Sequence, residues 1–130
     1  MYSNAQYCAE HMNWTGNMLE TLGPGNVILA ALPLFHSFGQ TCNQNAAILA
    51  GGALTYMERF DPEQALRVME RDRVTLFSGV PTMYFQLLHF PGGNRFDLSS
   101  LRYCMSGGAA MPVEVLKAFD ERYRVNILEG

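Results

Sequence analysis

The sequence predicts an α/β fold, with a layered, mainly parallel sheet of five strands and helices on both faces. Short apolar runs alternate with stretches of helical periodicity along the 130 residues, and no hairpin signal separates one run from the next. Parallel neighbours require a crossover of about a dozen residues or more, so this spacing favours parallel pairing. The expected strands cover residues 27–33, 53–57, 74–78, 101–105 and 125–128.

The first half of the chain carries two helical stripes, each stopped by glycine. Apolar residues recur at helical spacing over residues 3–22, and Gly23-Pro24-Gly25 ends this stripe. A continuous apolar run follows at residues 27–33, which is typical of a strand covered on both faces. A second stripe over residues 38–50 ends at Gly51-Gly52.

The clearest helix start lies in the second half of the chain. Asp61 can cap the helix, Pro62 fits its first position, and Gln64 completes the spacing of a capping box. Further helices are expected over residues 81–90 and from residue 112.

Composition and charge exclude several classes of protein. Hydrophobic residues make up 48% and charged residues 16%, which excludes a disordered tail, and the formal charge of −3 provides no basic field for nucleic acid. Cys8, Cys42 and Cys104 lack CxxC spacing, so we expect reduced thiols, no metal site and a cytoplasmic protein. No stretch approaches the ~20 apolar residues of a membrane span.

The turns that follow the strands are the candidate site, because ligands collect at the carboxyl ends of parallel strands. We expect His36, Gly79 and Gly108 to lie along one edge of the sheet. His36 either serves a site or only bonds a neighbouring carbonyl, and the sequence leaves both open. The turn at Gly107-Gly108 admits a flat ligand close to the backbone, but a tight strand-to-helix turn has the same pattern. Residues 79–82 are more typical of a helix start than of a pocket wall.

Seven segments, in this order, resemble the AMP-forming acyl-CoA synthetases, which are relatives of the luciferases and of peptide-synthetase adenylation domains. They cover residues 32–39 (LPLFHSFG), 45–52 (NAAILAGG), 59–63 (RFDPE), 79–84 (GVPTMY), 98–102 (LSSLR), 106–112 (SGGAAMP) and 128–130 (LEG). Each segment alone is a weak signal. Together they span nearly the whole chain, and the wording of residues 33–39 is most similar to the fatty-acyl branch.

The resemblance implies a parent fatty acyl-CoA ligase that uses ATP, Mg²⁺ and coenzyme A. The fatty acid is activated to an acyl-adenylate with release of pyrophosphate, and the acyl group then passes to the thiol of coenzyme A, leaving AMP. His36 is implied as the catalytic residue beside the acyl carboxylate. The acyl group is implied to contact Phe35, His36, Gly79, Val80, Pro81, Thr82 and Gly130. The adenine is implied to contact Gly107, Gly108, Ala109, Ala110, Glu129 and Gly130.

The same resemblance implies that residues 1–130 are one internal segment of the large N-terminal adenylation domain. The phosphate loop is expected upstream of Tyr2, and a Tyr-Gly-x-Thr-Glu run and a small C-terminal domain are expected after Gly130. We therefore expect the segment to be inactive alone, to need the remaining parts of its domain, and to self-associate through uncovered apolar faces. The alternatives are a non-catalytic, flavodoxin-like binding module and the adenylation domain of a peptide synthetase.

Overall fold

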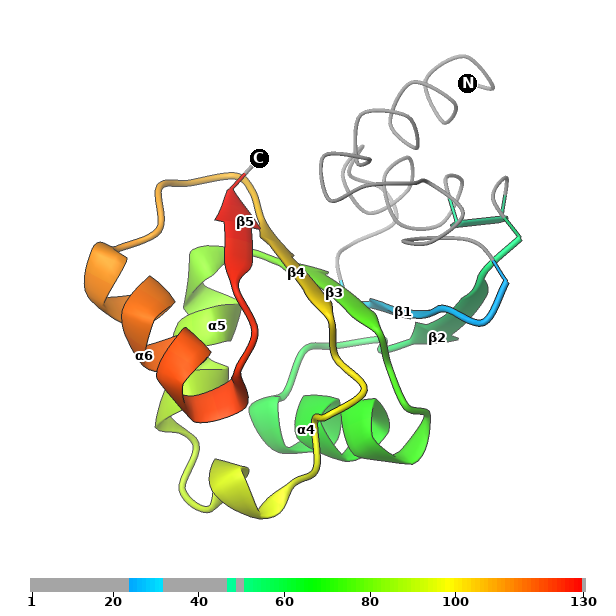
Figure 1. Ribbon diagram of the computed structural model, residues 1–130, viewed down its shortest axis with the longest axis horizontal. Coiled ribbons are helices and arrows are strands. Elements are labelled where there is room, and N and C mark those ends of the chain that lie inside the picture. The colour runs from blue at the N-terminus through cyan, green and yellow to red at the C-terminus, as the bar shows by residue number, and fades with distance from the viewer. Residues whose placement is uncertain (1–23, 32–46, 49–50, 130) are drawn as a thin grey trace.

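The computed structural model describes residues 24–31, 47–48 and 51–129, which contain a five-stranded, entirely parallel sheet (Figure 1). The strand order is β2-β1-β3-β4-β5. The strands are β1 (Val27–Ala30), β2 (Ala53–Tyr56), β3 (Leu76–Gly79), β4 (Tyr103–Ser106) and β5 (Ile127–Glu129). Each pair of neighbours runs parallel, so the predicted α/β class and parallel pairing are confirmed.

Three of the strands begin two residues later than the sequence predicts. The start of β3 shows the reason, because Val74 N–H donates to the carbonyl of Met69 and closes the preceding helix (3.1 Å). The carbonyl of Thr75 accepts from the N–H groups of Arg102 (2.9 Å) and Tyr103 (3.0 Å), where β4 begins. Apolar residues before each strand are therefore buried in connections rather than in the ladder.

Three helices follow β2, β3 and β4 in turn. They are α4 (Pro62–Arg71), α5 (Pro81–His89) and α6 (Val113–Tyr123), and a short 3₁₀ turn, η3 (Gly93–Arg95), follows α5. The predicted cap of α4 is confirmed, since the carboxylate of Asp61 accepts from Gln64 N–H at 3.0 Å. The predicted helix end at Gly51-Gly52 is also confirmed, because both amides donate to the carbonyl of Ala47 and Gly51 has a φ of 90°.

The winding of the chain reverses between β1 and β3. The step from β1 to β2 runs in one direction across the sheet, whereas the steps to β3, β4 and β5 run in the other. Right-handed crossovers place α4, α5 and α6 on the same face, as Figure 1 shows. The helix expected over residues 38–50 lies outside the described residues except for two helical positions, Ala47 and Ile48.

The core lies between the sheet and these three helices. Leu29, Phe77, Cys104 and Ile127 form one row across four strands, and each is less than a tenth exposed. The ring of Tyr84 on α5 packs at 5.2 Å from that of Phe77, measured between centroids. On the other face of the sheet Ile28 and Leu76 are fully buried, so both faces are covered.

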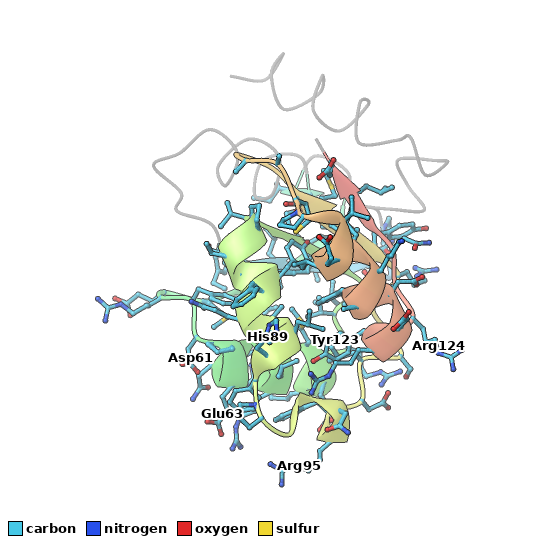
Figure 2. The ribbon with its side chains drawn as sticks, turned by 90° about the vertical axis from the view of Figure 1, so that its left-hand side faces the viewer. Asp61, Glu63, His89, Arg95, Tyr123 and Arg124 are labelled. Carbon is cyan, nitrogen blue, oxygen red and sulfur yellow. The ribbon has the colours of Figure 1, made fainter. Side chains whose placement is uncertain are left out.

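The last turn of α5 is held by two side chains of α6. Arg122 donates to the carbonyls of Leu88 and Phe90, and the hydroxyl of Tyr123 donates to the carbonyl of Leu87 at 3.2 Å. Figure 2 shows Tyr123 and His89 at this shared end of the helix pair. These bonds satisfy carbonyls that have no partner within the helix. None of the helices in the described part of the chain is long and apolar enough to cross a membrane.

Candidate functional site

The carboxyl ends of β3, β4 and β5 form one continuous row. Gly79, Ser106 and Glu129 are the last residues of these strands, and they are register partners across the sheet. Gly107 N–H donates to the carbonyl of Gly79 at 3.2 Å, so the turns after β3 and β4 contact one another. The expectation that Gly79 and Gly108 share an edge is confirmed. His36, Phe35 and Gly130 lie outside the described residues.

Steric crowding favours glycine at the end of β3. A Cβ at this position would lie 2.9 Å from Cζ of Phe77 and 3.4 Å from the sulfur of Met83. Val80 then takes an extended conformation, and Pro81 occupies the first helical position of α5. Residues 79–82 are therefore both the helix start that their pattern favours and part of the candidate edge, with Thr82 exposed.

The turn after β4 presents bare backbone beside this helix start. Gly108 has a φ of 86°, in the left-handed region that glycine adopts without strain. A Cβ on Gly108 would lie 3.7 Å from a methyl group of Val80, so the two turns line a common surface. Gly107 is buried, whereas Gly108, Ala109 and Ala110 are exposed. Small exposed residues in this position leave room for a flat ligand to approach the main chain.

Glu129 holds the turn after β4 in place. Its carboxylate accepts from the backbone N–H of Met111 at 2.9 Å, and Met111 is itself only 5% exposed. A hydrogen bond to an ionised acceptor is among the stronger ones in proteins. The side chain at the end of β5 thus fixes the far end of the glycine turn, a contact that sequence reasoning did not include.

Tyr84 ties β3 to β4 directly below the edge. Its hydroxyl lies 3.0 Å from the carbonyl of Phe77 and 2.5 Å from that of Met105, and the residue is fully buried. Burial raises the pKa of the Tyr84 phenol well above its ordinary value. Burial likewise raises the pKa of the Cys104 thiol, so this cysteine stays protonated and is not a nucleophile.

Two other features of the described residues do not belong to this edge. No group of three or more His, Cys, Asp or Glu side chains among them could hold a metal ion. A hollow of about 440 Å³ lies near the opposite ends of β4 and β5, lined by residues that include Arg102, Tyr103, Arg124 and Asn126. Its lining shares no residue with the candidate edge.

The fold is a parallel α/β sheet whose winding reverses between β1 and β3, with glycine turns at the carboxyl ends of its strands, where ligands collect in folds of this kind. A family profile described as "AMP-binding enzyme" matches residues 1–130, and the chain belongs to this family. The chain is 35% identical over 128 residues to the long-chain-fatty-acid–CoA ligase of Bacillus subtilis (strain 168). That match covers 98% of this chain and 22% of the relative, so the chain spans about a fifth of the relative's length.

Two solved structures have the same arrangement of elements. The N-terminal domain of FACL13 from Mycobacterium tuberculosis superposes with a TM-score of 0.84 at 21% identity, over 98% of this chain and 30% of that one, which shows the shared fold. The anthranilate CoA ligase AuaEII, solved in complex with anthranoyl-AMP, superposes with a TM-score of 0.80 at 26% identity. It covers 98% of this chain, and the match covers 24% of that enzyme.

Proposed function

We propose that this chain is the acyl- and adenine-facing segment of an AMP-forming fatty acyl-CoA ligase. The complete enzyme would convert a fatty acid, ATP and coenzyme A into acyl-CoA, AMP and pyrophosphate through an acyl-adenylate. The observation that carries the proposal is the contact between the two glycine turns at the carboxyl edge, in a chain of the AMP-binding family. The similarity to the ligase AuaEII, whose structure contains anthranoyl-AMP, supports the proposal that an acyl-adenylate binds at this edge.

We assign a different part of the adenylate to each of the two turns. The exposed backbone after β4 is assigned to the adenine, because a planar ring can stack against residues without bulky side chains. The start of α5 is assigned to the acyl group, with Val80 between the two. The adenine-facing residues are Gly107, Gly108, Ala109, Ala110, Glu129 and Gly130. The acyl-facing residues are Phe35, His36, Gly79, Val80, Pro81, Thr82 and Gly130, with His36 as the catalytic residue.

Phosphate binding and metal binding are assigned to other parts of the adenylation domain. The described residues offer no cluster of carboxylates for Mg²⁺, and Glu129 is engaged by Met111 N–H. We propose that Mg²⁺, the ATP phosphates and the coenzyme A thiol are bound by the phosphate loop, the Tyr-Gly-x-Thr-Glu run and the C-terminal domain that the resemblance implies, and not by the described residues. A cytoplasmic location is proposed for the enzyme, in line with its use of ATP and coenzyme A.

Exposed apolar side chains support contact with the rest of such a domain. Phe85 on α5 is 51% exposed and Val113 at the start of α6 is 57% exposed, and Ile48 and Tyr56 are similarly open. Side chains of this kind bury apolar area when another segment packs against them. We propose that the segment alone self-associates through these residues, which light scattering as a function of concentration would test.

The first test is the coding sequence on both sides of this segment, followed by an assay of the whole encoded protein. A phosphate-binding loop upstream and a Tyr-Gly-x-Thr-Glu run downstream are expected. The whole protein should release pyrophosphate from ATP in the presence of fatty acids, more readily than with aryl acids such as anthranilate. His36→Ala is expected to lower this rate strongly. Pyrophosphate release only with amino acids, or a downstream carrier domain, would instead assign the chain to a peptide synthetase.

A second test uses the 130-residue chain itself. Without the phosphate contacts, we expect an ATP dissociation constant of about 1 mM or weaker, because a net ~4 kcal/mol is what adenine contacts leave after the cost of association. Calorimetry with ATP and Mg²⁺ measures this dissociation constant directly. Micromolar binding would contradict the assignment of the ATP phosphates to other segments. The strand order also occurs in flavodoxin-like proteins, so a chain that purifies with a flavin spectrum would favour that binding module instead.

A further inference from the structure

Ser106 carries a buried hydroxyl that has no hydrogen-bond partner. The residue is 1% exposed, and its Oγ is the buried side-chain oxygen left unpaired among the residues that the structure describes. By contrast, the buried side chains of Thr75 and Asn26, directly before β3 and β1, bond each other at 3.1 Å. An unpaired hydroxyl in this environment destabilises the fold, so its presence calls for an explanation.

The neighbours of Ser106 explain why the chain itself provides no partner. On one side its register partner is Gly79, and the ring of Phe77 and the sulfur of Met83 lie where a Gly79 side chain would be. The carbonyl of Gly79 already accepts from Gly107 N–H. On the other side the carboxylate of Glu129 is bonded to Met111 N–H. The neighbouring strand ends thus place a glycine without a side chain, a carbonyl bonded to Gly107 N–H and a carboxylate bonded to Met111 N–H beside Ser106, and none of these groups bonds its hydroxyl.

We propose that Ser106 is a ligand-binding residue whose hydroxyl forms its hydrogen bond with the bound acyl-adenylate. This inference rests on the proposed function and adds Ser106 to the residues assigned to the acyl group and the adenine. The partner atom is a hydrogen-bond acceptor of the adenylate, either an oxygen of the acyl carbonyl or a ring nitrogen of the adenine. Ser106 lies in the middle strand of the row, directly before the Gly107-Gly108 turn, so it is placed between the acyl-facing and adenine-facing groups.

The turn after Ser106 allows the hydroxyl to become accessible. Gly107 and Gly108 have no side chains to move, and Gly108 is exposed with a φ of 86°. The bond from Gly107 N–H to the carbonyl of Gly79 is long, at 3.2 Å. A small displacement of the turn on ligand binding would bring the hydroxyl into contact with the adenylate at the strand ends.

The experiment compares Ser106→Ala with Ser100→Ala in the whole enzyme that contains this chain. Ser100 is a matched control, because its hydroxyl donates to the carbonyl of Val74 at 2.9 Å near the opposite end of β4. Without ligand, Ser106→Ala should unfold at the wild-type temperature or above it, whereas Ser100→Ala should unfold at a lower temperature. With a non-reactive acyl-sulfamoyl adenosine as the probe, Ser106→Ala should bind about 2- to 10-fold more weakly, and Ser100→Ala should bind as the wild type does.

Two further arms identify the partner atom and protect the test against misfolding. Titration with AMP alone and with the fatty acid alone shows which half of the adenylate is sensitive to the loss of the hydroxyl. Ser106→Cys keeps nearly the same volume and has only a weak donor, so it should fold normally and bind weakly, as Ser106→Ala does.

The outcomes separate this inference from the proposed function. If the wild-type enzyme does not bind the probe, the proposed function is wrong. If the wild type binds and Ser106→Ala binds equally well, the function stands and the role of Ser106 is refuted. A lower unfolding temperature for ligand-free Ser106→Ala would also refute it, because the hydroxyl would then have a structural partner in the chain.

Discussion

Replacing Tyr84 by phenylalanine tests whether the hydroxyl below the candidate edge stabilises the fold. The change removes one oxygen and leaves the ring packed between Phe77 and Phe119. It also removes the donor for two carbonyls, those of Phe77 (3.0 Å) and Met105 (2.5 Å), in a fully buried position. A lost hydrogen bond together with incompletely paired carbonyls predicts a loss of about 1–2 kcal/mol in the free energy of unfolding at pH 7.

The pH dependence of this loss provides a second, independent measurement. Burial raises the pKa of Tyr84 in the folded state, while in the unfolded state it has its ordinary pKa near 10. Below about pH 10 both states keep the proton, and the contribution of Tyr84 is constant. Above that pH the unfolded state loses the proton first, so the stability of the wild type should fall by about 1.4 kcal/mol per pH unit relative to Tyr84→Phe. The two proteins should therefore become equally stable near about pH 11.

Urea unfolding followed by circular dichroism at pH 7, 9, 10 and 11 measures both effects. In a separate thermal unfolding experiment at pH 7, the melting temperature of the variant should be lower by about 3–8 °C. Tyr123→Phe is a matched control, since that hydroxyl has one carbonyl partner at 3.2 Å and is partly exposed, so its removal should cost less. Equal stability of Tyr84→Phe and the wild type at pH 7 would refute the reasoning, as would a difference that does not shrink above pH 10.

Three other substitutions test the Asp61 cap, Gly79 and the bond from Met111 N–H to the carboxylate of Glu129. Asp61→Ala should lower the free energy of unfolding by about 1 kcal/mol and Asp61→Asn by much less, because asparagine retains the capping oxygen; urea titration distinguishes them. Gly79→Ala should cost about 1–3 kcal/mol, since the new methyl group would lie 2.9 Å from the Phe77 ring, and unchanged stability would show that the ring moves freely. Glu129→Ala should speed hydrogen exchange at the amide of Met111 more than Glu129→Gln, which keeps an acceptor. Equal exchange rates in the wild type and both variants would mean that the bond from Met111 N–H to Glu129 is not formed in solution.

Local patterns were sufficient to predict the strands, their parallel pairing and the main helix boundaries. Asp61 specifies a helix start because its carboxylate accepts from the amide of Gln64, three residues on, and Gly51 specifies a helix end through its positive φ. Both signals act within one turn of chain, so they can be interpreted without knowing the rest of the fold. The strand starts were placed too early because Val74 is apolar, as a strand residue would be, yet its amide closes α4.

The chemistry of the edge depends on contacts between strands, which periodicity does not specify. Glu129 meets Met111 across 18 positions of sequence, and Tyr84 reaches Met105 across 21. The unpaired state of Ser106 follows from what its two neighbours in the sheet offer, and therefore from register. A serine that ends a strand before two glycines is the one signal that could have drawn attention to it. The conclusion needs the coordinates of all three strands.

Side chains of α6 hold one end of α5, so the two ends of this helix should differ in how well they tolerate substitution. Its last turn is bonded by Arg122 and Tyr123, and its middle is fixed by the Tyr84 hydroxyl, whereas its first turn has no side-chain cap. Mutations in the first turn, at exposed Thr82 for instance, therefore leave the anchoring of the helix intact. A substitution at this end should therefore cost less stability than one at the end that Arg122 and Tyr123 hold.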